Sequence, residues 1–427
     1  MHFLALDLGS SYTKCFVLED GKCRESMQIP AEPLRKDGAA RSEANAQSYY
    51  QDVRSLLAGM VTENTRGILF STQMHGFVLA DESFNPVSPY VSWQDRACTE
   101  ISPWGNTWRQ TLMELLDQQE FRNSGVPLKE CLALCNLFAR MKTGLSIPDG
   151  TRLCTLGGYM IGRLCGRHVC HISNAGPLGL ADMKHGTWNA RIIAAAGMER
   201  LIFPELLRDL SPCGTAEICG QCIEIYPDIG DQQVCAFGAS LEPETGLHIN
   251  IGTAGLIGAA CAQWREGPFE NRAWLKPGYY LRTVSGLPGG RDLNNVQMYL
   301  AQRDGLGTEE AWKRMCSAVC IEPSFICWDF DDLGASVRSL PAWVSLEDAA
   351  CSLYLEMAKR YKAAAQGMMD TITSIRFSGG GVLKNPALRK ALLDQFPNVP
   401  PEDDMLRDVI LGLEVLSQSV QMRMEKR

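Results

Sequence analysis

A pattern that occurs twice constrains the fold more than any other feature of the chain. Residues 4–22 read LALDLGSSYTKCFVLEDGK, and residues 247–266 read LHINIGTAGLIGAACAQWRE. Each copy is an apolar strand with one polar residue, then a Gly, small residues that include a hydroxyl, and a second apolar strand. Gly9 and Gly252 suit tight turns because glycine has no Cβ. The pattern therefore predicts two β-hairpins in a duplicated chain with both turns facing one cleft, although two ordinary hairpins in unrelated sheets would look similar.

The rest of the chain alternates strands with helices. Residues 157–166 (GGYMIGRLCG) predict a helix, residues 346–373 predict a long helix, and residues 374–396 predict a strand, a Gly-rich turn and a helix. This alternation predicts an α/β fold in both halves. A chain of 427 residues exceeds one ordinary core. We expect a boundary at residues 240–246, between an N-terminal domain, 1–240, and a C-terminal domain, 241–427.

Composition and charge exclude several classes of protein. The net charge of −8 without a Lys/Arg block argues against nucleic acid or an anionic membrane as a partner. No apolar run reaches the roughly 18 residues of a membrane helix, and Asp7 interrupts the apolar N-terminus, which also lacks the basic start of a signal peptide. The 17 cysteines lie mostly in apolar runs, so we expect reduced, mostly buried thiols in a cytoplasmic protein. Cys219 and Cys222 form a single C-x-x-C, which is too little for a zinc site.

The two predicted turns suit phosphoryl transfer. This chemistry needs donors around the phosphates, a carboxylate near the metal and a base for the attacking hydroxyl. Asp7, at the end of its strand, could hold hydrated Mg²⁺, which prefers one or two carboxylates together with waters and phosphate oxygens. The turns would supply N–H and hydroxyl donors from Gly9, Ser10, Ser11, Gly252 and Thr253.

Other candidate residues each have a structural alternative. Residues 377–385 (FSGGGVLKN) could meet a nucleotide or simply open a helix, since they match neither a Walker loop nor the dinucleotide fingerprint. Gln73 and His75 could bind a ligand or satisfy the fold. Asp231 could cap a helix or take a proton from a substrate hydroxyl. Residues 93–96 (WQDR) could contact a substrate or form a surface ion pair beside a buried Trp.

Taken in order, these motifs resemble one family. They are D-x-G-S-S…K at 7–14, Q-M-H-G at 73–76, W-x-D-R at 93–96, G-D-Q-Q at 230–233, I-G-T-A-G at 251–255 and S-G-G-G…N at 378–385. From residue 1 to about 400 the chain resembles the FGGY carbohydrate kinases. Its ketose branch is the most similar, with sedoheptulokinases first and xylulokinases next. The resemblance implies the actin-like duplicated ribonuclease-H fold, with two domains around a central cleft.

The resemblance also implies roles for individual residues. The activity would be ATP- and Mg²⁺-dependent phosphorylation of the terminal hydroxyl of a ketose, sedoheptulose or xylulose. Asp231 matches the catalytic base and Asp7 the carboxylate near Mg²⁺. The phosphate loops match at Ser11, Lys14 and Thr253, and the adenosine site at Gly379, Gly380 and Asn385. The residues that lie where the family meets its sugar are Gln73, Met74, His75, Trp93, Asp95 and Gln232.

Two alternatives from other functional classes stay open at this point. One is a non-catalytic relative that binds sugar or nucleotide. The other is an actin-like ATPase that activates a partner through an iron–sulfur cluster, which the number of cysteines suggests. The sequence leaves the oligomeric state open, a homodimer included.

Overall fold

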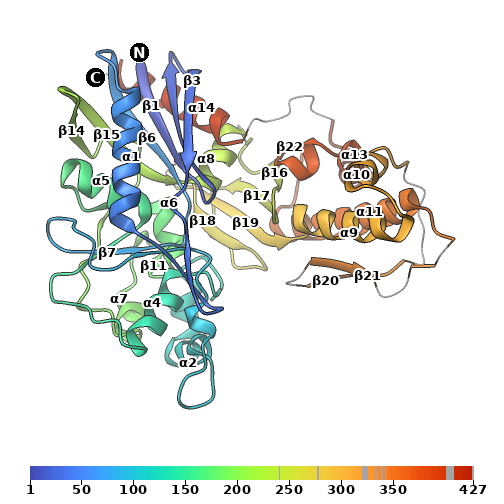
Figure 1. Cartoon of the computed structure of the whole chain (residues 1–427), viewed down its shortest axis with the longest axis horizontal. Helices are drawn as coiled ribbons and strands as arrows, with labels where there is room; N and C mark the ends of the chain where they lie inside the picture. The colour runs from blue at the N-terminus through green and yellow to red at the C-terminus, as the bar shows by residue number, and fades with distance from the viewer. Residues whose placement is uncertain are drawn as a thin grey trace. The chain divides into compact units, whose positions relative to one another are not determined.

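The computed structural model describes residues 1–239, 241–276, 278–319, 326–331, 334–337, 340–341, 343–400 and 408–425. The chain divides into two compact units. Unit 1 comprises Met1–Gly238, Asn271–Tyr279 and Val409–Arg427, and unit 2 comprises Ala239–Glu270 and Tyr280–Asp408. Both units mix helices and sheet (Figure 1).

Unit 1 is built on a six-stranded sheet with the order β14-β15-β6-β1-β2-β3. The predicted first hairpin is confirmed, because β1 pairs antiparallel with β2, which pairs antiparallel with β3. β6 runs parallel to both β1 and β15, and β14 closes the other edge. The strand bounds are β1 His2–Leu8, β2 Tyr12–Glu19, β3 Lys22–Pro30, β6 Thr65–Thr72, β14 Gly214–Ile218 and β15 Gln221–Gly230.

Both faces of this sheet are buried. Successive side chains of a strand point to opposite faces, and in β1 Leu4, Leu6 and Leu8 belong to one apolar cluster while Phe3 and Ala5 belong to another. Helices α1 (Ala46–Met60) and α5 (Leu156–Cys165) supply the first cluster. Helices α8 (Asp231–Gly238) and α14 (Asp408–Met424) supply the second. Since Asp7 shares its face with Phe3 and Ala5, it lies on the side that α8 covers.

The remaining elements of unit 1 form small sheets and helices around this core. Two- and three-stranded sheets join β4 (Arg35–Asp37), β5 (Arg41–Ala44) and β8 (Tyr90–Val91), β7 (Val78–Ala80) and β9 (Arg152–Cys154), β10 (Val169–His171) and β13 (Glu205–Leu207), and β11 (Ala181–Asp182) and β12 (Thr187–Trp188). The other helices are η1 Ala97–Thr99, α2 Trp108–Leu115, α3 Gln118–Arg122, α4 Ala133–Lys142, α6 Ile172–Ala175, η2 Gly176–Leu178 and α7 Ala190–Ala195.

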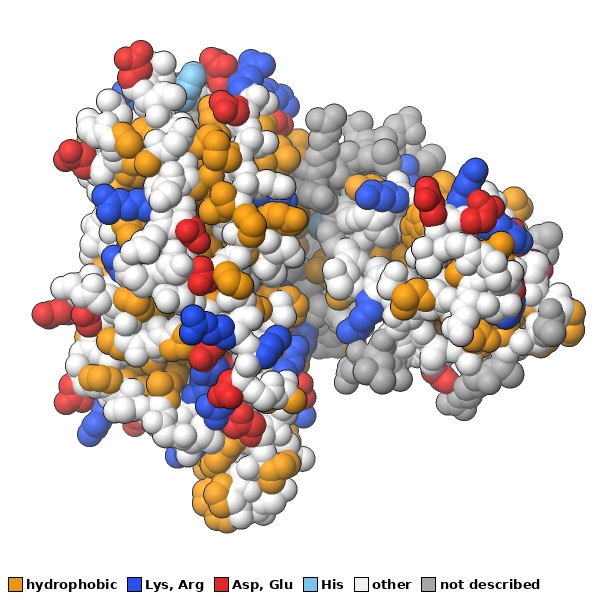
Figure 2. Space-filling view, in the orientation of Figure 1, with side chains coloured by type: hydrophobic (Ala, Val, Ile, Leu, Met, Phe, Trp, Pro, Cys, Tyr) orange, Lys and Arg blue, Asp and Glu red, His pale blue; other side chains and the backbone are white. Residues whose placement is uncertain are grey.

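The surface of unit 1 carries one group of exposed apolar side chains near α2. Ile101 is 66% exposed and Trp104 is 74% exposed, with Met113 and Leu115 nearby in sequence and about half exposed. Figure 2 shows hydrophobic side chains at the lower end of the unit, where Figure 1 labels α2. Lys, Arg, Asp and Glu side chains are interspersed over the rest of the visible face of the unit.

Unit 2 repeats the local pattern of unit 1. Its five-stranded sheet has the order β18-β19-β17-β16-β22. The predicted second hairpin is confirmed, because β16 pairs antiparallel with β17, and β22 lies parallel to β16 as β6 does to β1. The bounds are β16 Gly246–Ile251, β17 Gly255–Cys261, β18 Glu270–Ala273, β19 Tyr280–Leu287 and β22 Ser374–Ser378.

Helices enclose one apolar core in unit 2. The predicted long helix is α11, whose Leu353, Tyr354 and Tyr361 are fully buried in this core. The helices are α9 Gly290–Asp304, α10 Thr308–Cys316, α11 Leu346–Met368, α12 Gly380–Leu383 and α13 Pro386–Asp394, and a small sheet joins β20 Trp328–Asp331 and β21 Gly334–Val337.

The compact units are discontinuous in sequence, unlike the two predicted domains. The first crossing lies after Gly238, two residues before the predicted division, while Ser240 is outside the described residues. The C-terminal helix α14 returns to unit 1, where Glu414 accepts a hydrogen bond of 2.9 Å from the Cys23 N–H. Residues 271–279 also join unit 1. The assignment of functions to 1–240 and 241–427 stays a prediction.

The state of the cysteines differs in one respect from the expectation of reduced thiols. Fifteen cysteines of the described chain are free, seven of them buried. Cys351, in α11, is disulfide-bonded, so the expectation is wrong there. Local sequence could not reveal this, because disulfide pairing depends on how distant residues meet. None of the described helices is both long enough and apolar enough to cross a bilayer.

Candidate active site

The site begins where three parallel strands end side by side. Leu8 of β1 pairs with Thr72 of β6, and Thr72 pairs with Gly230 of β15. The carboxyl ends of parallel strands meet at one edge of a sheet, where open α/β folds bind ligands. Asp7 comes directly before this row, and Asp231 comes directly after it as the first residue of α8. The fold therefore brings together two carboxylates that lie far apart in the sequence.

Asp231 has the protonation behaviour of a general base. Burial, and next the negative charge of Asp7, raise the pKa of the Asp231 carboxyl to about 6. Its Oδ1 accepts a hydrogen bond of 2.8 Å from the Gln232 N–H, and the charge of Arg272 opposes the increase in pKa. A base is most effective when its pKa lies near the operating pH. Asp231 is thus mostly ionised at neutral pH and still able to accept a proton.

The first turn places polar groups beside Asp7. Lys14 of β2 pairs directly with Asp7 across the hairpin, and the Ser71 hydroxyl donates to Asp7 Oδ1 over 3.1 Å. The turn residues Ser10 and Ser11 are exposed. A Cβ on Gly9 would lie 3.0 Å from the Tyr12 carbonyl oxygen, which is tighter than ordinary contact. The turn therefore favours glycine and presents two hydroxyls next to a carboxylate and an ammonium group.

The Q-M-H-G segment follows β6 and packs against both turn and helix. The Gln73 side chain donates through Nε2 to the Gly9 carbonyl over 3.3 Å. A Cβ on Gly230 would come within 2.5 Å of Met74 Sδ, so Met74 packs directly below the start of α8. His75 has a φ of 71° and its Nδ1 lies 2.9 Å from the Pro177 carbonyl, so Nδ1 is the donor. The segment is held closely at the predicted sugar side of unit 1.

Gln232 and Arg272 form a buried pair behind Asp231. Gln232 is 8% exposed and accepts through Oε1 from the guanidinium of Arg272, which is 5% exposed. Arg272 could not be predicted as a partner of Gln232, because it belongs to residues 271–279, a short segment of unit 1 that no motif marks.

Trp93 and Asp95 have different positions although they are neighbours. Trp93 is partly buried and donates through Nε1 to Ser10 Oγ over 2.9 Å. Asp95 is fully buried, and its carboxylate accepts from the Ser42 N–H at 2.8 Å, the Ala97 N–H at 3.1 Å and Arg140 Nη2 at 2.6 Å. A buried carboxylate needs such donors. This position favours a structural role for Asp95 over direct contact with a sugar, so the sugar contact stays an untested prediction.

In unit 2 the second turn is enclosed by two glycine-rich segments. Gly379 has a φ of 86°, and a Cβ there would lie 2.5 Å from the Ile251 carbonyl carbon and oxygen. The Gly290 N–H donates to the Gly252 carbonyl over 2.7 Å, which joins the start of α9 to the turn. Thr253 is exposed. Backbone therefore packs on backbone here, and the turn exposes Thr253 at the end of β16.

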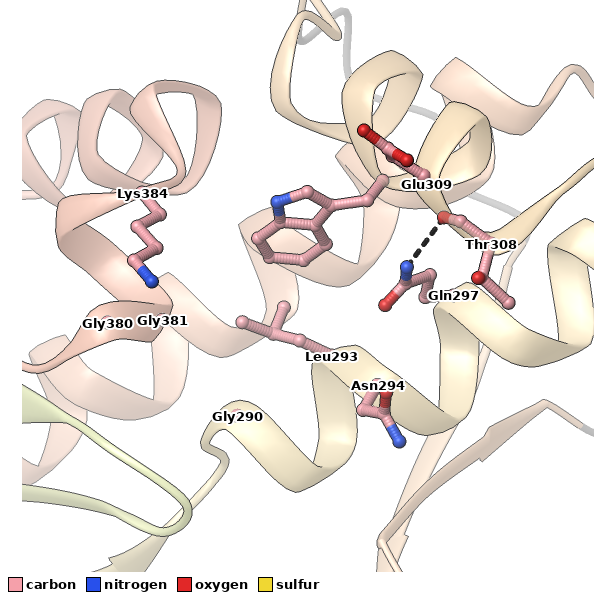
Figure 3. Close-up of a pocket in the computed structure, with 10 residues that line it drawn as sticks. Gly290, Leu293, Asn294, Gln297, Thr308, Glu309, Gly380, Gly381 and Lys384 are labelled. Carbon is pink, nitrogen blue, oxygen red and sulfur yellow. Dashed lines mark hydrogen bonds between the residues drawn. The ribbon is translucent and has the colours of Figure 1, made fainter.

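A pocket of about 430 Å³ lies beside this turn within unit 2. Leu293, Asn294 and Gln297 come from α9, Thr308 and Glu309 from α10, and Gly380, Gly381 and Lys384 from the α12 segment (Figure 3). Gly290 and Trp312 complete the lining. The pocket thus has an indole, amide groups, one ammonium group and one carboxylate around a glycine-rich floor.

Asn385 is close in sequence to this pocket but does not line it. Its side chain is fully buried, caps α13 by accepting from the Leu388 N–H at 3.0 Å, and donates to the Tyr354 hydroxyl at 2.9 Å. These contacts favour a structural role for Asn385, and its predicted contact with adenosine stays untested. Gly380 is exposed and lines the pocket.

The described residues contain no group of three His, Cys, Asp or Glu side chains that could hold a metal. A Mg²⁺ ion at Asp7 would therefore depend on waters and phosphate oxygens for its remaining ligands, which is usual for this ion. Cys219 and Cys222 are free and exposed. The iron–sulfur alternative gains no support from these positions.

The comparison with a family model decides the classification. Residues 2–238, more than half of the chain, match the model of the FGGY family of carbohydrate kinases, N-terminal domain. The chain belongs to this FGGY family. The predicted family is confirmed by this match, which runs from β1 to the end of α8.

Individual relatives of this FGGY chain carry different substrate names. It is 25% identical over 280 residues to a xylulose kinase of Lactococcus lactis, an alignment that covers 60% of this chain and 53% of the relative. The chain thus spans about half the length of the named relatives it matches. A gluconate kinase structure from Lactobacillus acidophilus superposes with a TM-score of 0.81 at 16% identity, covering 99% of this chain and 89% of that one. A glycerol kinase from Plasmodium falciparum, with ADP, gives 0.79 at 14% identity and covers 99% and 90%.

These superpositions confirm the predicted α/β fold of the FGGY kinases, the duplicated actin-like ribonuclease-H fold. Identities this low carry the fold alone, so the arrangement of the two domains around a cleft stays a prediction.

A buried polar cluster behind Asp231 was missed from the sequence. Asp228 of β15 is fully buried, and burial raises the pKa of its carboxyl to about 6. It accepts from Thr155 Oγ1 at 2.6 Å, the His171 N–H at 2.8 Å and Asn174 Nδ2 at 3.0 Å. Asn174 also donates to Thr72 Oγ1 at 2.9 Å. The cluster therefore ties β15 to β6 next to the site.

Ser173 extends this cluster to the residue before Asp231. Its Oγ accepts from the Gly230 N–H at 3.0 Å and lies 2.8 Å from His171 Nδ1. The Ser173 N–H also donates to His171 Nδ1 at 3.2 Å, so that nitrogen is an acceptor. Burial lowers the pKa of His171 to about 4, which keeps the ring neutral. Ser173 and Asn174 begin residues 173–183 (SNAGPLGLADM), whose polar start before an apolar run is a signal that could have led to this cluster.

The raised pKa of Asp231 predicts a cost in stability above pH 6. Its carboxyl binds a proton more tightly in the folded chain (pKa about 6) than unfolded (3.8), so its stabilising effect is present at low pH and lost as pH rises through 6. Asp231→Asn keeps a side-chain oxygen that can accept from the Gln232 N–H and removes the charge. We expect the variant to be more stable than the parent at pH 8, by up to about 3 kcal/mol, with the gain shrinking towards pH 4. Urea unfolding at both pH values measures this.

Asp117→Asn is the matched control, because Asp117 caps α3 by accepting from the Gln119 and Glu120 N–H groups and is exposed. It should give no gain at pH 8. A lower stability of Asp231→Asn at both pH values would contradict the prediction and show that the Asp231 carboxylate stabilises the fold.

Proposed function

We propose that this chain is an ATP-dependent kinase that phosphorylates the terminal hydroxyl of a ketose. The observation that carries the proposal is Asp231, which begins α8 beside Asp7 with a pKa raised to about 6. Membership of a family of carbohydrate kinases supports the same activity.

Asp231 would act as the general base on the sugar hydroxyl. Its pKa lets it accept a proton at neutral pH, and such a base contributes about 10²–10⁴ in rate. Asp7 would hold Mg²⁺, which neutralises charge on the phosphates when bound. One carboxylate with the Ser71 hydroxyl close by fits an ion that keeps waters and phosphate oxygens as its other ligands.

The proposed nucleotide-binding residues lie in the two turns and in the pocket of unit 2. The phosphates would meet N–H and hydroxyl groups of the first turn (Gly9, Ser10, Ser11), Lys14, and the second turn (Gly252, Thr253). The adenosine would enter the pocket lined by Trp312, Gly380 and Gly381. An indole suits the adenine ring because aromatic side chains stack on nucleobases. Asn385 would support the adenosine site indirectly by holding α13 in place, since its side chain caps this helix.

The sugar would lie next to Gln73, Met74, His75, Trp93 and Gln232. We propose xylulose or sedoheptulose as the ketose. A relative named xylulose kinase supports the first. The proposal of sedoheptulose rests on sequence resemblance alone. Selectivity for the length of the sugar depends on a few contacts of small energy.

A panel of sugars tests the activity. Coupled ADP release is measured with xylulose, sedoheptulose, ribulose, fructose, fuculose, gluconate and glycerol. We expect at least one ketose to stimulate ADP release, Asp231→Asn to lower that turnover by two or more orders of magnitude, and kcat/KM to fall as pH drops below about 6, where Asp231 takes up a proton. Asp117→Asn should leave turnover unchanged. If no sugar stimulates ADP release, the non-catalytic alternative is favoured. Normal turnover in Asp231→Asn would show that Asp231 is not the general base.

The adenosine pocket has its own test. Trp312→Ala removes the indole, and base–aromatic stacking is worth about 1–3 kcal/mol, so a non-hydrolysable ATP analogue should bind roughly tenfold to hundredfold more weakly by calorimetry. Trp343, which is 73% exposed in the same unit, provides the control variant Trp343→Ala. An unchanged affinity in a folded Trp312→Ala protein would place the adenosine elsewhere.

A further inference from the structure

Ser10 of the first turn is held by two residues predicted to meet the sugar. Trp93 donates through Nε1 to Ser10 Oγ over 2.9 Å, and Ser10 Oγ donates to Gln73 Oε1 over 3.4 Å. Gln73 also donates through Nε2 to the Gly9 carbonyl over 3.3 Å. All these residues belong to unit 1. Segments 63 and 83 residues further along the chain thus meet at one serine hydroxyl.

The chemistry of these groups fixes the direction of each bond. An indole N–H can only donate, so Ser10 Oγ accepts from Trp93. The serine hydroxyl has a single proton, and the Gln73 carbonyl oxygen accepts it. While both contacts exist, the Ser10 proton is directed at Gln73 and is not available to a phosphate oxygen.

The exposure of Ser10 and the partial exposure of Trp93 suggest a switchable contact, although Gln73 itself is only 8% exposed. A buried polar cluster such as that of Asp228 would be costly to open, but a contact reached by solvent can exchange partners at little cost. A sugar hydroxyl both donates and accepts, so it can replace Ser10 as the partner of the indole and of the amide.

We propose that Ser10, Gln73 and Trp93 form a hydrogen-bond switch that makes nucleotide use depend on the sugar. Without sugar, Trp93 and Gln73 hold the Ser10 hydroxyl. When sugar hydroxyls take these two partners, Ser10 is released and donates to a phosphate oxygen. The switch limits hydrolysis of ATP by water, which competes with the sugar in an open site. This inference rests on the proposed kinase function and adds a positioning role for Trp93 and Gln73.

Trp93→Phe tests the switch without knowledge of the sugar. The change keeps an aromatic ring but removes the N–H donor that holds Ser10 Oγ within reach of Gln73, so the serine hydroxyl can turn away from Gln73. Because one net hydrogen bond is at stake, we expect a non-hydrolysable ATP analogue with Mg²⁺ to bind roughly three- to tenfold more tightly in the absence of sugar, and sugar-free ATP hydrolysis to rise by a similar factor. Calorimetry and phosphate release measure the two effects. Trp104→Phe, an exposed tryptophan of the same unit, should change neither.

A double variant identifies the route. In the Ser10→Ala background, Trp93→Phe should no longer tighten binding. Gln73→Met removes the acceptor of the Ser10 proton, together with the donor to the Gly9 carbonyl. It should tighten binding in the parent, so the proposal can be judged even if Trp93→Phe folds poorly. Unchanged affinity in both single variants, or equal tightening with and without Ser10, would overturn the proposal. The kinase proposal fails on a different result, the absence of turnover with any sugar.

Discussion

The proximity of two carboxylates at the ends of parallel strands underlies the whole site. Leu8, Thr72 and Gly230 form one row across the sheet, which fixes Asp7 before the row and Asp231 after it. Burial and mutual repulsion raise the pKa of Asp231 to about 6. The fold tolerates this because Asp228 and Ser173 tie β15 and the Gly230 peptide to neighbouring segments. The same burial that prepares a base also costs stability at neutral pH.

The sequence predicted those features that local pattern determines. The two hairpins follow from strand–Gly–strand patterns, and Asp7 and Asp231 stand out because each is a carboxylate at the end of an apolar segment. The Gly-rich turn after β22 was also predicted from its three glycines. The structure explains them in part, because Gly379 has a φ of 86° and close backbone contacts that favour glycine. In all these cases the residues adjacent in sequence are enough to predict the local structure.

Contacts between distant segments could not be predicted. Thr155 and Asp228 are 73 residues apart, and the burial of Asp95 depends on Arg140, 45 residues away. Nothing near Asp95 distinguishes a buried ion pair from a sugar contact, because W-x-D-R fits both. Trp312 lines the pocket from a helix without any motif, so only the packing of α9, α10 and α12 reveals it.

Measurement of the Asp231 pKa tests the coupling of the two carboxylates most directly. Carboxyl carbon-13 NMR of the folded protein, assigned with Asp231→Asn, gives this value in the parent and in Asp7→Asn. We expect a pKa of about 6 in the parent, and a lower pKa in Asp7→Asn because one of its two causes, the charge of Asp7, is removed. Titration of Asp231 near the ordinary 3.8 in the parent, or the same raised pKa in both proteins, would contradict the coupling of the two carboxylates.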